Sequence, residues 1–187
     1  MKHTVHKVFS IGAFEKEEQW LNQMAAKGMI LTDVGFCKYV FEEGLPGKYI
    51  YRLELLNNLP SHAESIAYIS FLEDMGIDHV GSYLRWVYFR RKASEGNFDL
   101  FSDIDSRIVH YKRITTLSSV LTLVLAILAV VYFGQAVSFF ATHTSGFFQP
   151  FLGYGIIFTI VAALFPLVTR PVRKSLKALL KERWIRE

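Results

Sequence analysis

The pattern of apolar and charged positions divides the chain into two very different parts. From Ile114 to Thr169 there are 56 consecutive residues without a Lys, Arg, Asp or Glu, whereas charged residues make up 20% of the chain. This stretch holds two apolar runs, Leu117 to Phe140 and Phe151 to Val168. At about 1.5 Å per residue, the first run can cross a hydrocarbon core of about 30 Å with some tilt, and the second only just. The pattern predicts a transmembrane helical hairpin over residues 114–169.

The first hundred residues alternate between helix-like and strand-like patterns. Apolar residues at helical spacing occur in 14–27, just before Gly28, and again after the capping-box sequence Ser61-x-x-Glu64. A Gly/Pro loop separates two of the strand-like segments, which we therefore expect to pair as a hairpin. The strand-like segments are 4–9, 31–41, 48–55 and 79–91. The resulting β-α-β-β-α-β order is typical of a ferredoxin-like sandwich, in which two helices cover one face of a four-stranded antiparallel sheet.

The segments on either side of the hairpin have helical patterns of their own. Residues 98–113 contain neither Gly nor Pro, and we expect a helix that Ser102 caps and that continues into the first span. Residues 170–187 place apolar side chains at helical spacing among basic ones, a pattern typical of helices on anionic membrane surfaces. No internal repeat is visible in the sequence.

These observations predict an α+β protein with four parts. A ferredoxin-like cytoplasmic domain occupies residues 1–97, and a juxtamembrane helix follows at 98–113. The transmembrane hairpin covers 114–169, with spans at about 117–140 and 151–168, and a basic amphipathic tail helix covers 170–187.

The formal net charge of +4 is distributed unevenly along the chain. Residues 1–113 hold fourteen basic and fifteen acidic side chains, whereas residues 170–187 hold seven and two. A nucleic-acid-binding domain is expected to carry a basic face, so the nearly neutral first part argues against a nucleic-acid partner. Basic residues flank both spans, and the positive-inside rule therefore predicts a multi-pass protein of the cell membrane with both termini in the cytoplasm. The flanking residues expected at the membrane surface are Lys112, Arg113, Arg170, Arg173, Lys174 and Lys177.

The chain offers little evidence for catalysis or for a bound cofactor. It contains no phosphate-binding loop, dinucleotide-binding fingerprint, zinc-protease helix or nucleophile elbow. Its six histidines are scattered over different predicted elements, so we expect no metal site. Cys37 is the only cysteine and is expected to be a small buried side chain. Helix capping accounts for two members of the densest acidic group, Asp99, Asp103 and Asp105. We therefore predict no enzymatic activity and no cofactor.

The fourth predicted strand carries the strongest binding signal. It has large side chains on both faces, so the helix-free face of the sheet is expected to meet a partner protein, another copy of the chain, the bilayer surface or a small apolar ligand. RNA is disfavoured because Glu54 lies on the third predicted strand, where phosphate would have to approach. The candidate binding residues on this face are Tyr83, Arg85, Trp86 and Tyr88.

Four segments of the chain resemble the bacterial family catalogued as domain of unknown function 2812. They are Phe14–Gly28, Pro46–Glu54, Gly81–Phe89 and Phe98–Arg107, and the resemblance covers most of residues 7–114. It implies a membrane protein, typically of Gram-positive bacteria and so of the bacterial inner membrane, whose gene tends to neighbour one for a PadR-type transcriptional regulator. The resemblance brings no catalytic residues with it.

The leading hypothesis is a membrane-anchored cytoplasmic module with a binding or regulatory role and no enzymatic activity. Its aromatic sheet face would receive a protein or ligand, and the helix at 98–113 would pass that state to the hairpin. The alternative is an accessory subunit of a transporter or envelope-stress system that binds another membrane protein through the hairpin. A third possibility is an enzyme that uses Asp99, Asp103 or Arg107 at the membrane surface.

Overall fold

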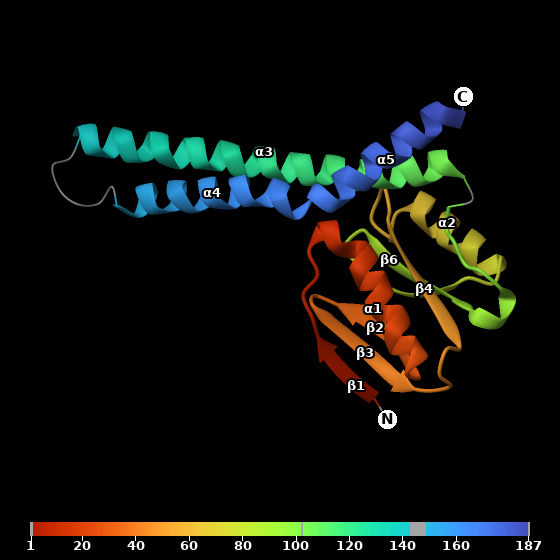
Figure 1. Ribbon diagram of the computed structural model, residues 1–187. Helices are drawn as coiled ribbons and strands as arrows, with labels where there is room; N and C mark the ends of the chain where they lie inside the picture. The colour runs from red at the N-terminus through yellow and green to blue at the C-terminus, as the bar shows by residue number, and fades with distance from the viewer. Residues whose placement is uncertain (1, 102, 143–148, 187) are drawn as a thin grey trace.

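The computed structural model describes residues 2–101, 103–142 and 149–186, and it shows a mixed α/β domain attached to a long helical hairpin (Figure 1). The domain contains two three-stranded antiparallel sheets. The first has the order β1-β3-β2, from β1 (Lys2–His6), β2 (Met29–Gly35) and β3 (Lys38–Glu43). The second has the order β4-β6-β5, from β4 (Tyr49–Leu55), β5 (Asp78–Tyr83) and β6 (Trp86–Lys92).

The two sheets repeat the same topology. Each begins with a strand, continues through a helix, α1 (Phe14–Ala26) or α2 (Ala63–Asp74), and ends in a hairpin whose last strand is central. The second strand of each unit also carries a register shift against the central strand, and β2 lies beside β5. The sequence gives no sign of this repeat, because strand pairing can be maintained while the side chains of the two units differ.

The mixed α/β class is confirmed, but six strands in two sheets replace the predicted four-stranded sheet. The predicted strand 31–41 is the β2–β3 hairpin, and the predicted strand 79–91 is the β5–β6 hairpin. Segments 31–41 and 48–55 do not pair with each other, since β3 pairs with β1 and β2 while β4 pairs with β6. Two-residue turns lacking Gly or Asn, Phe36-Cys37 and Leu84-Arg85, concealed both hairpins.

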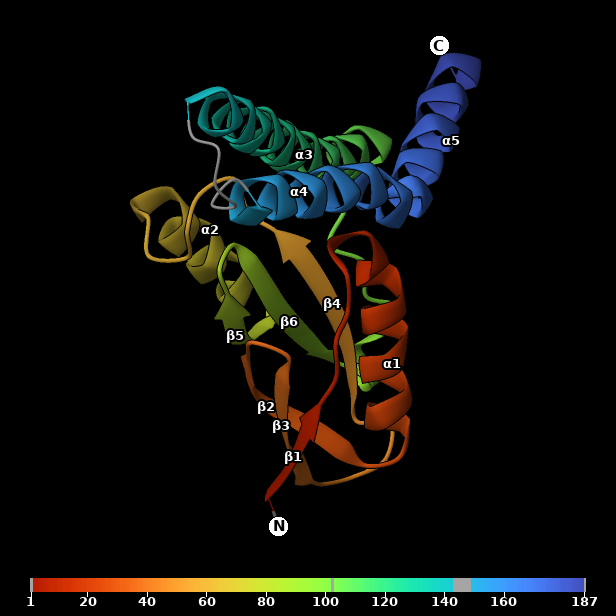
Figure 2. The same ribbon diagram turned by 90° about the vertical axis from the view of Figure 1, so that its left-hand side faces the viewer.

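The second sheet is covered on both faces. Tyr88 of β6 packs with Leu21 of α1, whereas its neighbours Val87 and Phe89 pack with Ile69 of α2. Figure 2 shows α1 and α2 on opposite sides of this sheet. The prediction that one aromatic face of the sheet is free of helices is therefore wrong, because α1 covers the side of β6 that carries Tyr88.

The local signals at the helix ends are only partly as predicted. Gly28 follows α1 with a φ of 82°, and its N–H donates to the Ala25 carbonyl, as a C-terminal glycine should. The capping box predicted at Ser61 is wrong. α2 begins at Ala63, and the side chain of His62 caps it by accepting a hydrogen bond from the Glu64 N–H. A short 3₁₀ turn, η2 (Ala93–Glu95), follows β6.

Three helices form the remainder of the chain. They are α3 (Ile104–Thr142), α4 (Gln149–Val168) and α5 (Arg170–Arg186). α3 runs without a break from the domain into the first predicted span, and both α3 and α4 are long and apolar enough to cross a membrane. The predicted cap Ser102 lies outside the described residues, and the Asp103 carboxylate accepts the Ser106 N–H at 2.7 Å.

The base of the hairpin is packed firmly against the domain. A 3₁₀ turn, η1 (Ile11–Ala13), contacts the bend between α4 and α5, where a Cβ on Gly12 would lie 2.3 Å from the Val168 carbonyl oxygen. Val172 of α5 is buried with Tyr111 and Ile114 of α3. Val172 in the first half of α5 therefore packs on the protein, while Trp184 and Ile185 near its end are exposed.

Candidate functional site

A cavity of about 450 Å³ lies between the two βαββ units and the base of the α3–α4 hairpin. We call it the aromatic cavity. Turns β2–β3 and β5–β6 form its rim, and Figure 2 shows these turns close together below α4. Most of its lining is apolar or aromatic, from Phe9, Ile11, Phe14, Phe36, Tyr39, Leu55, Leu59, Tyr83, Leu84, Trp86, Tyr88, Leu117 and Leu121. Cavities of this size and character are typical of sites for small organic molecules.

Glu17 is the one acidic residue in the lining of this cavity. It lies on the buried stripe of α1 together with Phe14, Leu21 and Ala25, at a spacing that directs it towards the core. Only 8% of Glu17 is exposed. Its Oε1 accepts hydrogen bonds from the hydroxyl groups of Tyr39, at 2.7 Å, and Tyr88, at 2.6 Å. Two tyrosines from different sheets thus hold one oxygen of this carboxylate.

Among the described residues, Glu17 differs from other buried carboxylates of the domain in having no cation beside it. Burial raises its pKa above the usual value, although the two tyrosine hydrogen bonds act in the opposite direction. Burial and the neighbouring Glu17 raise the pKa of both Tyr39 and Tyr88, so both remain donors at neutral pH. Within the described chain, Glu17 has no basic group within 4.0 Å, and its Oε2 has no hydrogen-bond partner. The site therefore holds a buried carboxylate with one free oxygen and no counter-charge.

The rim of the aromatic cavity exposes apolar side chains. Phe36 and Leu84 are 75% and 65% exposed, and the Phe36 ring contacts the Tyr83 ring with centroids 5.9 Å apart. Both turns contain a residue with positive φ, Cys37 at 51° and Leu84 at 55°. Non-glycine residues pay of order 1–2 kcal/mol for this conformation. The domain thus tolerates strain and exposed apolar surface at the same place.

The opposite wall belongs to α3. Leu117 and Leu121 lie one turn apart at the start of the apolar part of α3, and both line the aromatic cavity. A molecule in the cavity would touch the domain and the first span at once. The sequence patterns did not predict this shared wall.

Two basic residues also line the aromatic cavity, and both are engaged elsewhere. Arg85 donates from Nε to the Leu56 carbonyl oxygen at 2.8 Å. The Lys7 ammonium lies 4.6 Å from the centre of the Trp20 ring and 5.1 Å from that of Phe9. The aromatic groups beside the cavity thus already attract one cation.

All four residues predicted for the binding face line the aromatic cavity, although they reach it from a hairpin and not from one flat strand. Tyr83 is half-buried at the rim, Arg85 is held by its hydrogen bond, and Trp86 packs against Phe14 with ring centroids 5.7 Å apart. Tyr88 lies deepest, at Glu17. Sequence reasoning missed Glu17 itself, whose signal was a charged residue in the apolar stripe of a helix.

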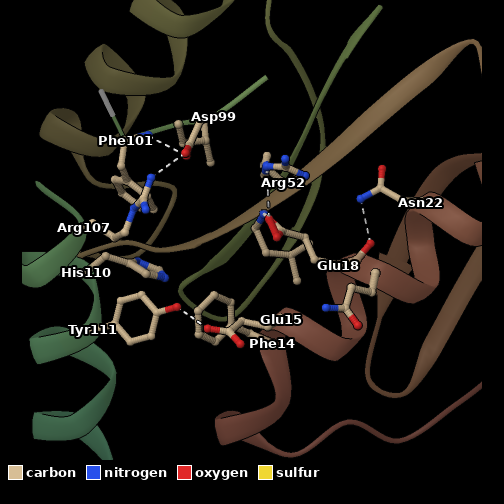
Figure 3. A pocket seen from close by; sticks show the side chains of 13 residues that line it. Phe14, Glu15, Glu18, Asn22, Arg52, Asp99, Phe101, Arg107, His110 and Tyr111 are labelled. Atoms are coloured by element: carbon tan, nitrogen blue, oxygen red, sulfur yellow. Dashed lines mark hydrogen bonds and ion pairs between the residues drawn. The ribbon is translucent and has the colours of Figure 1, made fainter. Parts of the chain in front are cut away.

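A second hollow of about 380 Å³, which we call the polar cleft, lies on the other side of α1, against the first turns of α3 (Figure 3). Here two acidic groups, Glu18 and Asp99, lie beside a cation. Arg107 bonds Asp99 at 2.6 Å, and the Glu18 carboxylate accepts the Leu53 N–H at 3.1 Å and lies 3.9 Å from the Arg52 Nε. Burial raises the pKa of Glu18 to about 7, against the opposing effect of Arg52.

The Asp99, Asp103 and Asp105 group forms ion pairs and helix caps, with Asp105 3.2 Å from Arg183.

The predicted membrane-surface residues divide into two sets. Arg113 is paired in the protein, since its Nη1 donates to Glu54 at 3.1 Å and to the Leu55 carbonyl oxygen. Lys112 is exposed. A shallow surface hollow at the α4–α5 bend is lined by Arg170, Arg173, Lys174 and Lys177. Across residues 2–101, 103–142 and 149–186, no group of three His, Cys, Asp or Glu side chains is placed to hold a metal ion.

Comparison with known proteins gave one match. A family model described as "Protein of unknown function (DUF2812)" matches residues 13–125, a range that includes α1, both βαββ hairpins and the first apolar turns of α3. Neither the curated proteins nor the solved structures searched gave a match.

Proposed function

The chain belongs to the DUF2812 family, and for this member we propose a membrane-anchored, non-enzymatic binding module that takes a small lipophilic molecule into the aromatic cavity. One observation carries the proposal. The cavity is walled on one side by Trp86 and Tyr88 of the domain and on the other by Leu117 and Leu121 of the apolar part of α3. A molecule bound in the cavity therefore contacts α3, the helix that enters the membrane, directly.

In this proposal α3 and α4 cross the cell membrane and both chain termini are cytoplasmic. The basic residues Lys112 and Arg170 flank the two apolar segments and support this orientation. Phe36 and Leu84 then lie beside the cytoplasmic leaflet, because they share a cavity with Leu121. A lipophilic molecule concentrated in that leaflet has a short path to the rim.

The base of the hairpin supplies a means of passing the bound state on. Gly12 in η1 touches the α4–α5 bend, and the Ser118 hydroxyl of α3 bonds the Thr169 hydroxyl of that bend at 3.2 Å. Ile11, in the same 3₁₀ turn as Gly12, lines the aromatic cavity. A ligand that shifts Ile11 therefore displaces a segment that packs against both membrane helices.

The lining of the cavity supports binding over catalysis. Cys37 is the one thiol there, and none of the described lining residues is a histidine that could activate it. The remaining polar groups include Glu17 and the two tyrosines that hold its Oε1. These groups orient a ligand but do not form a nucleophile and base pair.

A blocked cavity tests the proposal. The full chain in lipid nanodiscs is titrated with 1-aminoanthracene, a neutral probe that fluoresces in apolar cavities. Leu121→Trp fills the wall of the cavity, whereas Leu123→Trp places the same side chain on an exposed position of α3 that does not line it. We expect at least about tenfold weaker binding for Leu121→Trp, the loss of about 1.4 kcal/mol of contact, and no change for Leu123→Trp. Equal affinities for both variants would contradict the proposal.

A further inference from the structure

The free oxygen of Glu17 indicates what kind of molecule the aromatic cavity accepts. A carboxylate that is buried among apolar groups without a counter-charge is costly, and proteins usually provide a cation beside it. Glu18 and Glu54 follow this rule, with Arg52 and Arg113 as their partners. Glu17 departs from it, because its Oε2 has no partner among the described residues and the residue lines a cavity large enough for a ligand. The missing partner can be supplied by the ligand.

The walls of the cavity favour the same kind of ligand. Aromatic ring faces attract organic cations, and Tyr39, Trp86 and Tyr88 line the cavity beside Glu17. The two tyrosine hydroxyl groups already occupy Oε1, so a positive charge would meet Oε2. A small, strongly hydrated cation would lose its water shell in these surroundings, whereas a diffuse organic cation loses little.

The basic residues of the cavity do not reverse this preference. Lys7 and Arg85 line it as well, but Arg85 is held by the Leu56 carbonyl and Lys7 lies over the Trp20 ring. Neither of them lies within 4.0 Å of the Glu17 carboxylate. Glu17 is also the one charged residue of the lining that is buried.

We infer that the aromatic cavity binds a lipophilic organic cation, with the positive charge at Oε2 of Glu17 and the apolar body against the aromatic walls and Leu121. This inference rests on the proposed function, since it names the class of ligand for the same cavity. The exposed rim residues Phe36 and Leu84 let such a cation enter from the cytoplasmic leaflet, where it accumulates.

Competition with a reporter separates the inference from the proposal beneath it. Bound 1-aminoanthracene is displaced from the full chain in lipid nanodiscs by tetraphenylphosphonium, a lipophilic cation, or by triphenylphosphine oxide, a neutral aryl compound. The same titrations are made with Glu17→Gln, whose amide oxygen still accepts the tyrosine hydrogen bonds, and with Glu73→Gln, an exposed control on α2. Reporter binding to Glu17→Gln shows that the variant retains a folded cavity.

We expect Glu17→Gln to weaken displacement by tetraphenylphosphonium at least about tenfold, since the attraction between its positive charge and the carboxylate is lost. Displacement by triphenylphosphine oxide should change by less than about twofold, and Glu73→Gln should match the wild type. If the cation is displaced no more easily than the neutral compound, or if Glu17→Gln affects both equally, the cation inference is overturned while the cavity stands. If the reporter itself does not bind the wild type, the proposed function fails and this inference falls with it.

Discussion

Two hollows flank α1, and they treat neighbouring glutamates in opposite ways. In the polar cleft, Glu18 accepts a backbone N–H and faces Arg52. In the aromatic cavity, one residue earlier, Glu17 is held by two tyrosines and no cation. Farther along the joint between the domain and α3, Glu54 is paired with Arg113. Of these three carboxylates, only the one in the aromatic cavity has no cation within 4.0 Å.

The contrast separates charges that hold the protein together from a charge that is available to a ligand. Paired carboxylates at the joint tie α1, β4 and the base of α3 to one another, and their cations come from the chain itself. Glu17 accepts hydrogen bonds from two tyrosines, but no residue of the described chain supplies a cation beside it. In the proposed function, the joint is a structural region and the aromatic cavity a binding region, although both contain buried acids.

The largest expected effect on stability comes from removing the cation beside Glu54, which leaves this carboxylate without a counter-charge, as Glu17 is. Arg113→Gln removes its cation and should lower the free energy of unfolding by about 3–5 kcal/mol, because a buried carboxylate is left without its partner. Lys112→Gln, at the exposed position next to it, should change this free energy by less than about 0.5 kcal/mol. Denaturant unfolding of the full chain in detergent, followed by tryptophan fluorescence, measures both. Similar values for the two variants would mean that the ion pair does not stabilise the joint.

The pH dependence of stability should reveal Glu18. Its folded pKa of about 7 lies above the ordinary 4.5, so the folded state holds the proton more tightly. The corresponding stability is complete below pH 4.5 and is lost as the pH rises to about 7, up to about 3 kcal/mol for this one group. Glu18→Gln should flatten this fall in unfolding experiments across the same range. An unchanged slope in Glu18→Gln, with Glu73→Gln as the exposed reference, would contradict the assignment.

The contact between η1, which lines the cavity, and the bend between α4 and α5 should be sensitive to one methyl group. Gly12→Ala would place a Cβ 2.3 Å from the Val168 carbonyl oxygen, so we expect a loss of about 1–3 kcal/mol from overpacking. Gly153→Ala on α4 meets nothing within 4 Å and should be neutral or slightly stabilising, by up to about 1 kcal/mol. Thermal unfolding in detergent distinguishes the two. Should Gly12→Ala unfold like the wild type, η1 does not pack on the bend as described.

The smallest effect concerns the strained rim. Leu84→Gly relieves a positive φ of 55° and should raise the free energy of unfolding by about 0.5–1 kcal/mol. The same change removes an apolar rim side chain and should weaken binding of 1-aminoanthracene. Opposite signs for stability and binding are the expected signature of a rim that serves ligand entry. A variant that loses both would indicate that Leu84 supports the fold instead.

The sequence predicted some features of this molecule well, for identifiable physical reasons. The uncharged stretch from Ile114 to Thr169 predicted two long apolar helices, because lipid excludes unpaired charge over their whole length. The absence of Gly and Pro before it predicted the unbroken start of α3. Gly28 and Gly76 marked the ends of two helices, each with positive φ.

The number of strands and the residues around Glu17 were harder to predict. The turns at Phe36-Cys37 and Leu84-Arg85 use apolar or charged residues where Gly or Asn is usual, so alternation continued through them and two hairpins looked like two strands. The pairing of the two units then depended on contacts between distant segments, which periodicity does not report. Glu17 was visible as a charge on an apolar stripe, but its tyrosine partners come from β3 and β6 and required the fold.

The most direct measurement of the central claim is the affinity for tetraphenylphosphonium as a function of pH, in the wild type and in Glu17→Gln. Burial raises the pKa of Glu17 above its usual value, so its carboxylate should ionise, and cation binding should strengthen, as the pH is raised from acid through neutral. Tyr39 and Tyr88 remain neutral over this range, and the other groups of the cavity, Lys7, Cys37 and Arg85, are common to both proteins. The account predicts a rise in the wild type and a flat profile in Glu17→Gln. The same rise in both proteins would contradict it.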